Sequence, residues 1–95
     1  MHYVIQCLDH EGFVQKRLEH YEAHKAYLGS AGMKTVISGP LMADDETTMI
    51  GSCFVVEAAS LAEVQAFNQA DPFFKAGLWA TISIRPFLKR VDNRS

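Results

Sequence analysis

Residues 33–57, MKTVISGPLMADDETTMIGSCFVVE, decide the fold. Two runs in this stretch, 33–41 and 49–57, are rich in apolar and β-branched residues, and the polar segment 43–48 separates them. This pattern predicts two antiparallel strands joined as a hairpin. Pro40 has no backbone N–H to donate, so we expect the first strand to lie at a sheet edge or to contain a bulge.

A helix is predicted on each side of this hairpin in the sequence. Upstream, residues 13–31 show helical periodicity, and Gly29 and Gly32 mark the exit. The apolar stripe expected to pack on the sheet consists of Val14, Leu18, Tyr21 and Leu28, with Phe13 and Ala31 at its flank. Downstream, Ser60 and Glu63 form a capping box that opens a second helix, which should end near 69–70.

Two further strands complete the pattern. Residues 2–8 are apolar on both faces, which indicates an inner strand covered on two sides. Residues 78–88, interrupted by Pro86, form the last strand, and the polar tail 89–95 should fray. The order is βαββαβ. It predicts an α+β ferredoxin-like domain, with a four-stranded antiparallel sheet and two helices on one of its faces.

Composition limits the size, location and partners of the domain. The 95 residues support a single domain, 1–95, and 48% are hydrophobic. Because the two helices cover one sheet face only, we expect a homodimer in which two sheets stack. The net charge of −2 without a basic cluster argues against nucleic acid, and no apolar run is long enough for a membrane span. We expect a cytoplasmic protein in which Cys7 and Cys53 are buried and reduced.

Two polar residues share the predicted buried face of the first helix. Arg17 and His24 lie about 20° apart around the helix axis at 100° per residue. Burying such groups is costly unless they find partners. Arg17 could extend to solvent and His24 could be a satisfied boundary histidine, or both could line a site. His20 is four residues from His24, but no further metal-ligand pattern accompanies the pair, so we expect no metal.

Asp71 and Pro72 also allow two interpretations. Aspartate at the N-cap and proline at the first helical position favour a short helical turn up to Gly77. Alternatively, the Asp71 carboxylate orients His24 and stabilises its protonated form, as in general-base pairs.

Two small-residue segments could line the same cavity. Ser38, Gly39 and Pro40 close the first hairpin strand, and Gly39 could permit a close backbone approach to a ligand. Ser52 follows Gly51 at the start of the second strand. No nucleotide loop or haem-ligand motif is present, so we expect no cofactor.

Taken in order, these motifs resemble the YCII-related family. The resemblance covers residues 2 to about 89, and its other matching segments are Tyr3-Val4-Ile5, Glu57-Ala58, Asp71-Pro72-Phe73, Ala76-Gly77 and Arg85-Pro86-Phe87. It implies a dimeric α+β barrel with an active site around His24 and Asp71. Dehydrochlorination of a chlorinated hydroxyquinol is one activity in the family. Phe73 stands where tyrosine is more usual.

Three functions follow from these observations. In a lyase-type enzyme, His24 transfers a proton, Asp71 orients its ring, and Arg17 holds an anionic group of a small, anionic or aromatic substrate. The other expected ligand contacts are Ser38, Gly39, Pro40, Ser52 and Phe73. The alternatives are a small-ligand-binding or accessory dimer module without catalysis, and a purely structural dimer.

Overall fold

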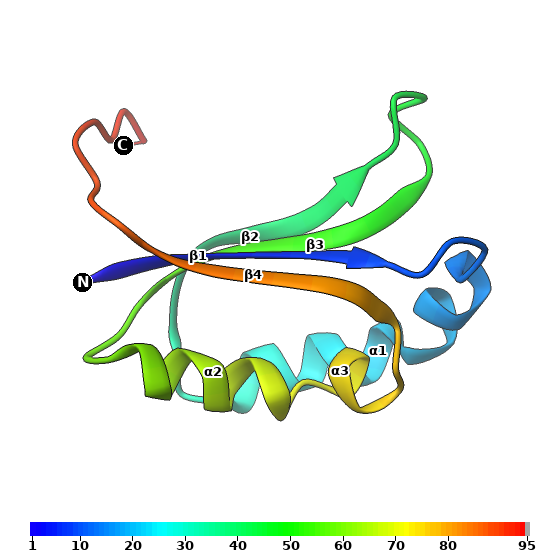
Figure 1. Cartoon of the computed structure of the whole chain (residues 1–95), viewed down its shortest axis with the longest axis horizontal. Coiled ribbons are helices and arrows are strands. Elements are labelled where there is room, and N and C mark those ends of the chain that lie inside the picture. The colour runs from blue at the N-terminus through cyan, green and yellow to red at the C-terminus, as the bar shows by residue number, and fades with distance from the viewer. Residues whose placement is uncertain (95) are drawn as a thin grey trace.

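The structure is a computed structural model that describes residues 1–94. Four strands and three helices follow one another as shown in Figure 1: β1 (His2–Asp9), α1 (Val14–Ser30), β2 (Lys34–Met42), β3 (Met49–Glu57), α2 (Leu61–Gln69), α3 (Pro72–Lys75) and β4 (Trp79–Phe87). The predicted ferredoxin-like α+β fold is confirmed, and each predicted element begins and ends within about two residues of its observed bounds.

The four strands form one antiparallel sheet in the order β2-β3-β1-β4. Strands β1 and β3 are therefore central, and β2 and β4 are the edges. Pro40 lies in β2 and Pro86 in β4, so both prolines are in edge strands, where a missing N–H is tolerated. A register shift between Thr35 and Ile37 adds a bulge to β2.

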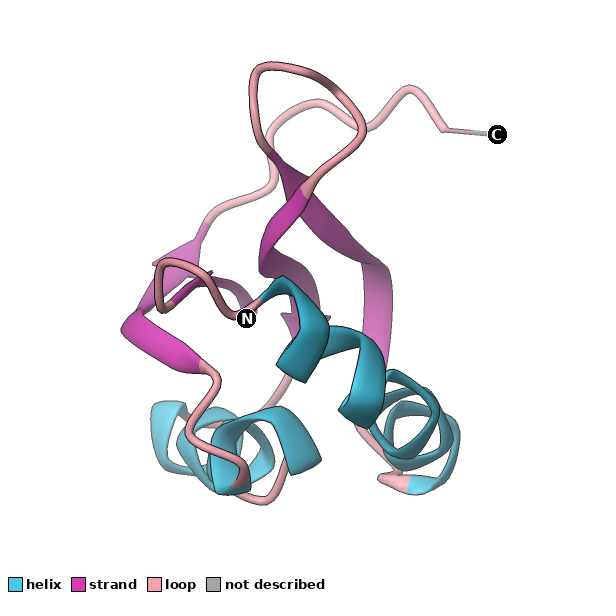
Figure 2. Cartoon of the chain, turned by 90° about the vertical axis from the view of Figure 1, so that its right-hand side faces the viewer, coloured by secondary structure: helices cyan, strands magenta, loops and turns pink. Residues whose placement is uncertain are grey.

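All three helices lie on the same side of the sheet, as Figures 1 and 2 show from two directions. The capping box at α2 forms as predicted at its serine, because the Ser60 hydroxyl accepts the Glu63 N–H at 3.3 Å. The Glu63 carboxylate accepts instead from the Ala59 N–H at 3.3 Å, one residue before the N-cap. The turn expected after Asp71 is α3. Within residues 1–94, no helix is long and apolar enough to cross a bilayer.

The core lies between the sheet and the helices. Its fully buried side chains come from every layer, and they include Ile5, Phe54, Val56, Val64, Phe73 and Leu78. Gly51 allows two central strands to approach, because a Cβ at this position would lie 2.3 Å from the Cys7 carbonyl oxygen. Gly39 has an ordinary backbone conformation, and a Cβ there would meet no protein atom within 4 Å.

The apolar stripe that was predicted to pack α1 against the sheet is mostly wrong. Leu18 is 49% exposed and Tyr21 is 40% exposed, and Val14 is also exposed, so of the expected stripe only Leu28 packs on the core. The buried residues of α1 are Arg17 and His24. These polar side chains can face the core because other elements supply their hydrogen-bond partners.

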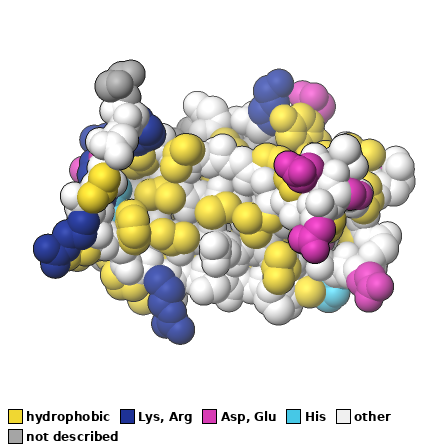
Figure 3. Space-filling view, turned by 90° about the horizontal axis from the view of Figure 1, so that it is seen from above, with side chains coloured by type: hydrophobic (Ala, Val, Ile, Leu, Met, Phe, Trp, Pro, Cys, Tyr) yellow, Lys and Arg dark blue, Asp and Glu magenta, His cyan; other side chains and the backbone are white. Residues whose placement is uncertain are grey.

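The opposite face of the sheet is uncovered in the single chain, so the cover that was expected on the second face of β1 stays a prediction. Cross-strand partners point to the same side, and the register places a set of apolar side chains on this face: Val4, Leu8, Ile37, Leu41, Val55 and Phe87. Figure 3 shows hydrophobic side chains across the middle of this face and charged ones at its ends. We call these six residues the open-face patch.

The two cysteines differ in burial. Cys7 is buried, as predicted, but Cys53 is only half-buried because its register position is on the open face. Neither forms a disulfide. The predicted fraying of the tail includes Ser95, which lies outside the described residues. Residues 88–94 have no helix or strand, and Arg94 donates to the Val36 carbonyl at 3.1 Å.

Candidate active site

The structure brings His24 and Asp71 together, although they are 47 positions apart. His24 comes from the middle of α1, and Asp71 from the junction between α2 and α3. The His24 Nδ1 lies 2.9 Å from Asp71 Oδ1 and 2.8 Å from Oδ2, and Asp71 is 1% exposed. A buried carboxylate thus holds one nitrogen of the imidazole.

Asp71 also caps α3, so its carboxylate forms both the predicted cap and the predicted contact with His24, and its part in general-base chemistry stays a prediction. Its Oδ1 accepts the Phe73 N–H at 2.8 Å, and Pro72 occupies the first helical position. The cap fixes the carboxylate from one side and His24 engages it from the other. Asp71 is therefore rigidly placed before any ligand binds.

The carboxylate selects the tautomer of the histidine. A carboxylate only accepts hydrogen bonds, so the His24 nitrogen that faces it must carry the proton, as Nδ1–H. Nε2 then has a free lone pair in the neutral ring. No residue among 1–94 makes a hydrogen bond to Nε2, and this nitrogen is not among the fully enclosed polar atoms.

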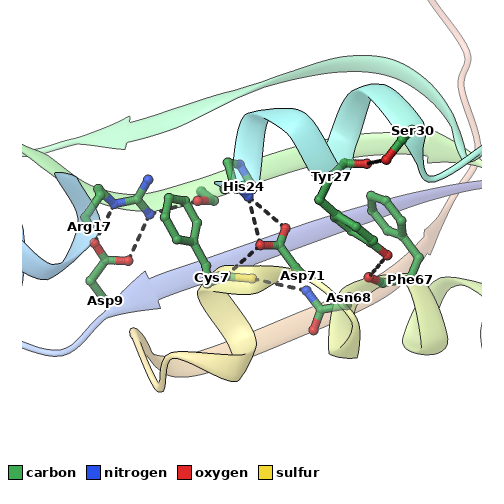
Figure 4. A network of polar contacts seen from close by, with 11 residues as sticks. Cys7, Asp9, Arg17, His24, Tyr27, Ser30, Phe67, Asn68 and Asp71 are labelled. Carbon is green, nitrogen blue, oxygen red and sulfur yellow. Dashed lines mark hydrogen bonds and ion pairs between the residues drawn. The ribbon is translucent and has the colours of Figure 1, made fainter. Parts of the chain in front are cut away.

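Arg17 is bound more tightly than the sequence suggested. Its Nε and Nη2 donate to the two Asp9 carboxylate oxygens at 2.6 and 2.9 Å, and Nη2 also donates to the Ser52 hydroxyl at 2.8 Å. Figure 4 shows this arrangement beside the His24–Asp71 pair. Asp9 was not among the predicted site residues. A buried arginine requires a carboxylate, and that requirement is the signal that could have identified Asp9.

Phe73 separates the two polar groups of α1. Its ring centroid is 4.7 Å from the Arg17 guanidinium carbon, and 4.0 Å from the His24 ring, at an interplanar angle of 14°. Arg17 and His24 are seven residues apart, a rise of about 10.5 Å, which leaves space for one ring between them. Phe73 is fully buried and does not line the cleft, so its ring contacts the site only through His24 and Arg17.

A cleft of about 300 Å³ opens beside these groups, between α1 and strands β2 and β3. Six of the predicted site residues line it: Arg17, His24, Ser38, Gly39, Pro40 and Ser52. Four residues that the sequence did not single out as ligand contacts also line it: Tyr21, Lys25, Leu28 and Phe54. The exposure of Tyr21 on α1 is thus explained, because its side chain faces a cleft rather than the core.

The described residues give little support to a cysteine nucleophile or to a bound metal ion. Burial raises the pKa of the Cys7 thiol to about 12, and Asn68 donates to its sulfur at 3.7 Å, so this thiol is a poor nucleophile near neutral pH. No group of three or more histidine, cysteine, aspartate or glutamate side chains within 1–94 is arranged to hold a metal ion.

The family follows from comparison with known proteins. The family model for the YCII-related domain matches residues 1–88. The chain belongs to the YCII-related family. Protein YciI of Escherichia coli O6:H1 is 34% identical to this YCII-related protein, over 94% of the chain and 98% of the relative. A protein of Haemophilus influenzae is 30% identical over the same shares.

Solved structures support the same assignment. The 5-chloro-2-hydroxyhydroquinone dehydrochlorinase TftG from Burkholderia phenoliruptrix AC1100, in complex with 2,5-dihydroxybenzoquinone, superposes on this YCII-related chain with a TM-score of 0.83. The two share 36% identity over 93% of this chain and 94% of TftG. A NIPSNAP domain protein from Burkholderia xenovorans, 15% identical with a TM-score of 0.52, is similar in fold alone.

Proposed function

We propose that this YCII-related protein is a lyase of the dehydrochlorinase type that acts on a small hydroxylated ring, with His24 as the proton-transfer group. One observation carries the proposal. A buried carboxylate holds Nδ1 of His24, which frees Nε2 beside a cleft of about 300 Å³. This volume is at the lower end of the range for small-molecule pockets, which suits a single ring.

The proposed reaction is an elimination that needs no cofactor. Nε2 takes a proton from the ring substrate, and the electron pair left behind forms the new double bond. Chloride departs with the electron pair of the C–Cl bond, so one proton and one chloride leave the substrate. Asp71 stabilises the imidazolium that forms, and water then takes its proton.

Two features of the cleft support a ring substrate. Phe54 and Leu28 give it apolar walls, and the Ser38 hydroxyl adds a polar group. Arg17 uses Nε and Nη2 within the protein, and no described residue accepts from its Nη1. Nη1 would donate to a ring oxygen. The 36% identity to TftG over nearly the whole chain favours this class of substrate.

The proposal includes a homodimer formed through the open-face patch. Ile37 is 56% exposed and Phe87 is 41% exposed in the single chain, and stacking two sheets would remove both from water. Ile37→Asp should therefore convert a dimer to monomer in light scattering and leave the monomer folded. A dimer unaffected by this change would contradict assembly through the sheet face. A cytoplasmic location, where thiols stay reduced, is also part of the proposal.

A binding module without catalysis is the second candidate, and a specific observation favours it. Asp71 is needed as the α3 cap and Arg17 as the partner of Asp9, so folding alone accounts for both. Turnover therefore has to be measured directly rather than inferred from the presence of these residues.

The deciding experiment compares wild type with His24→Asn. Asparagine keeps an amide N–H where Nδ1–H faces Asp71, but it has no nitrogen in the place of Nε2. Chloride release from 5-chloro-2-hydroxyhydroquinone should fall at least about 100-fold, the lower value for loss of a general base. Binding of 2,5-dihydroxybenzoquinone should change little.

His20→Asn is the matched control, because His20 is on the same helix and does not line the cleft. It should keep full turnover. Wild-type protein that binds the quinone but releases no chloride from any ring in a broad panel would favour the binding module.

A further inference from the structure

Lys25 is a cation at the rim of the cleft with no counter-ion of its own. It follows His24 on α1, is exposed to solvent and lines the cleft. None of the ion pairs formed by residues 1–94 includes its ammonium group. Its charge is therefore available to a ligand.

The remaining charges of the cleft are already compensated. Arg17 faces both oxygens of Asp9 across a bidentate ion pair, with the nearest contact at 2.6 Å. His24 is paired with Asp71. The residues that line the cleft include no aspartate and no glutamate. One positive charge, that of Lys25, is left without compensation, and it lies where a ligand would enter.

The walls of the cleft define what this charge would recognise. Tyr21 is four residues before Lys25 and lies one helical turn along the same face of α1, and both side chains line the cleft opposite Pro40 on β2. An aromatic face beside an ammonium group suits a flat molecule with an anionic oxygen at its outer end.

We infer that the cleft selects planar rings that carry an ionised oxygen, an enolate, phenolate or carboxylate, and that Lys25 rather than Arg17 binds this charge. The inference rests on the proposed function and deepens it by naming the ionisation state of the substrate. The anion stays at the rim beside Lys25. The proton that reacts lies deeper, within reach of His24 Nε2.

Binding of two ring probes tests the inference. At pH 7, 2,5-dihydroxybenzoquinone is ionised because it is a vinylogous acid, and 1,4-hydroquinone is neutral because phenols titrate near pH 10. Wild type should bind the ionised ring more tightly. Lys25→Gln should weaken binding of the ionised ring about fivefold in low salt, the upper value for an exposed ion pair, and leave hydroquinone binding unchanged. Salt at about 0.2 M should reduce the difference.

Lys75→Gln is the matched control, because Lys75 is an exposed lysine on α3 that does not line the cleft. It should bind both rings as wild type does. The inference is overturned if Lys25→Gln binds both rings as wild type does, if it weakens both equally, or if wild type shows no preference for the ionised ring.

The two proposals fail separately. A charge-dependent loss of binding in Lys25→Gln, in a protein that turns over no chlorinated ring, supports anion selection and contradicts the lyase. Turnover that depends on His24, without any effect of Lys25→Gln on either ring, supports the lyase and overturns anion selection.

Discussion

Replacing Asp71 with asparagine should slow proton transfer strongly and leave the fold nearly intact. The amide oxygen of asparagine can still accept the Phe73 N–H, which Asp71 Oδ1 accepts at 2.8 Å. The amide NH₂ then takes the place of Oδ2, 2.8 Å from His24 Nδ1, and can only donate, which favours Nδ1 as the acceptor and the ring proton on Nε2. In this variant His24 Nε2 presents an N–H to the cleft, whereas in the wild type Nε2 presents a lone pair.

The magnitudes follow from these contacts. Loss of the base should lower kcat/KM by about 10²- to 10⁴-fold. Asp71→Asn should cost about 1 kcal/mol of unfolding free energy, because a hydrogen bond to a charged group becomes a neutral one. Asp71→Ala should cost more. It removes the cap, worth about 1 kcal/mol, and leaves a buried Nδ1–H unsatisfied at about 1–3 kcal/mol.

Urea unfolding at a fixed protein concentration and chloride release from a chlorinated hydroxyhydroquinone measure the two effects. For a domain of this size, about 1 kcal/mol corresponds to about 4–8 °C in Tm, so Asp71→Ala should melt at least about 8 °C lower. Ser60→Ala is the control, since it removes a cap of the same kind from α2, away from the cleft. It should lose about 1 kcal/mol and no activity.

Two results would refute this reasoning. Wild-type turnover in Asp71→Asn would show that the tautomer of His24 does not matter to the reaction. An Asp71→Asn variant as unstable as Asp71→Ala would show that the amide oxygen does not preserve the cap of α3.

Three other predictions concern groups around the sheet. Burial raises the pKa of Cys7 to about 12 in the folded chain. The stability that comes from its neutral thiol should therefore be complete below pH 9 and should fall as the pH rises toward about 12. In urea unfolding, Cys7→Ala should flatten this decline. Cys53 should react with a thiol reagent in dilute protein and become protected at concentrations where the dimer forms. If the dimer forms and Cys53 is labelled at the same rate, the open face is not the interface. Arg17→Met should lower the unfolding free energy by about 3–5 kcal/mol, because it leaves Asp9 unpaired, and adding Asp9→Asn should recover part of that loss. If the losses of the two single variants simply add in the double variant, the ion pair is not stabilising.

The local features of this chain were readable from its sequence. The hairpin, the Ser60 cap and the edge position of Pro40 each depend on residues close together in the chain, so periodicity and turn chemistry were sufficient. The polar anomaly at Arg17 and His24 was visible for the same reason, because both lie on one helix.

What the sequence concealed depends on distant partners. Apolar periodicity favoured Leu18 for the buried face of α1, whereas Arg17 and His24 occupy that face. Their acceptors come from other elements: Asp9 and Ser52, 8 and 35 positions from Arg17, and Asp71, 47 positions from His24. The sequence could not decide whether Asp71 caps a helix or contacts His24, since one carboxylate has enough acceptor sites for both contacts. Lys25 carried no signal, because an exposed lysine on a helix is ordinary until a cleft is seen beside it.

The two edge prolines have a consequence for how copies of this chain can aggregate. A sheet grows into fibrils by hydrogen bonding a new strand to a free edge, and this chain has a proline in each of its two edge strands, Pro40 in β2 and Pro86 in β4. Lateral growth is disfavoured in both directions, and stacking across the face is left as the open route. Assembly of the chain should therefore stop at the dimer, which disfavours aggregation at high protein concentration.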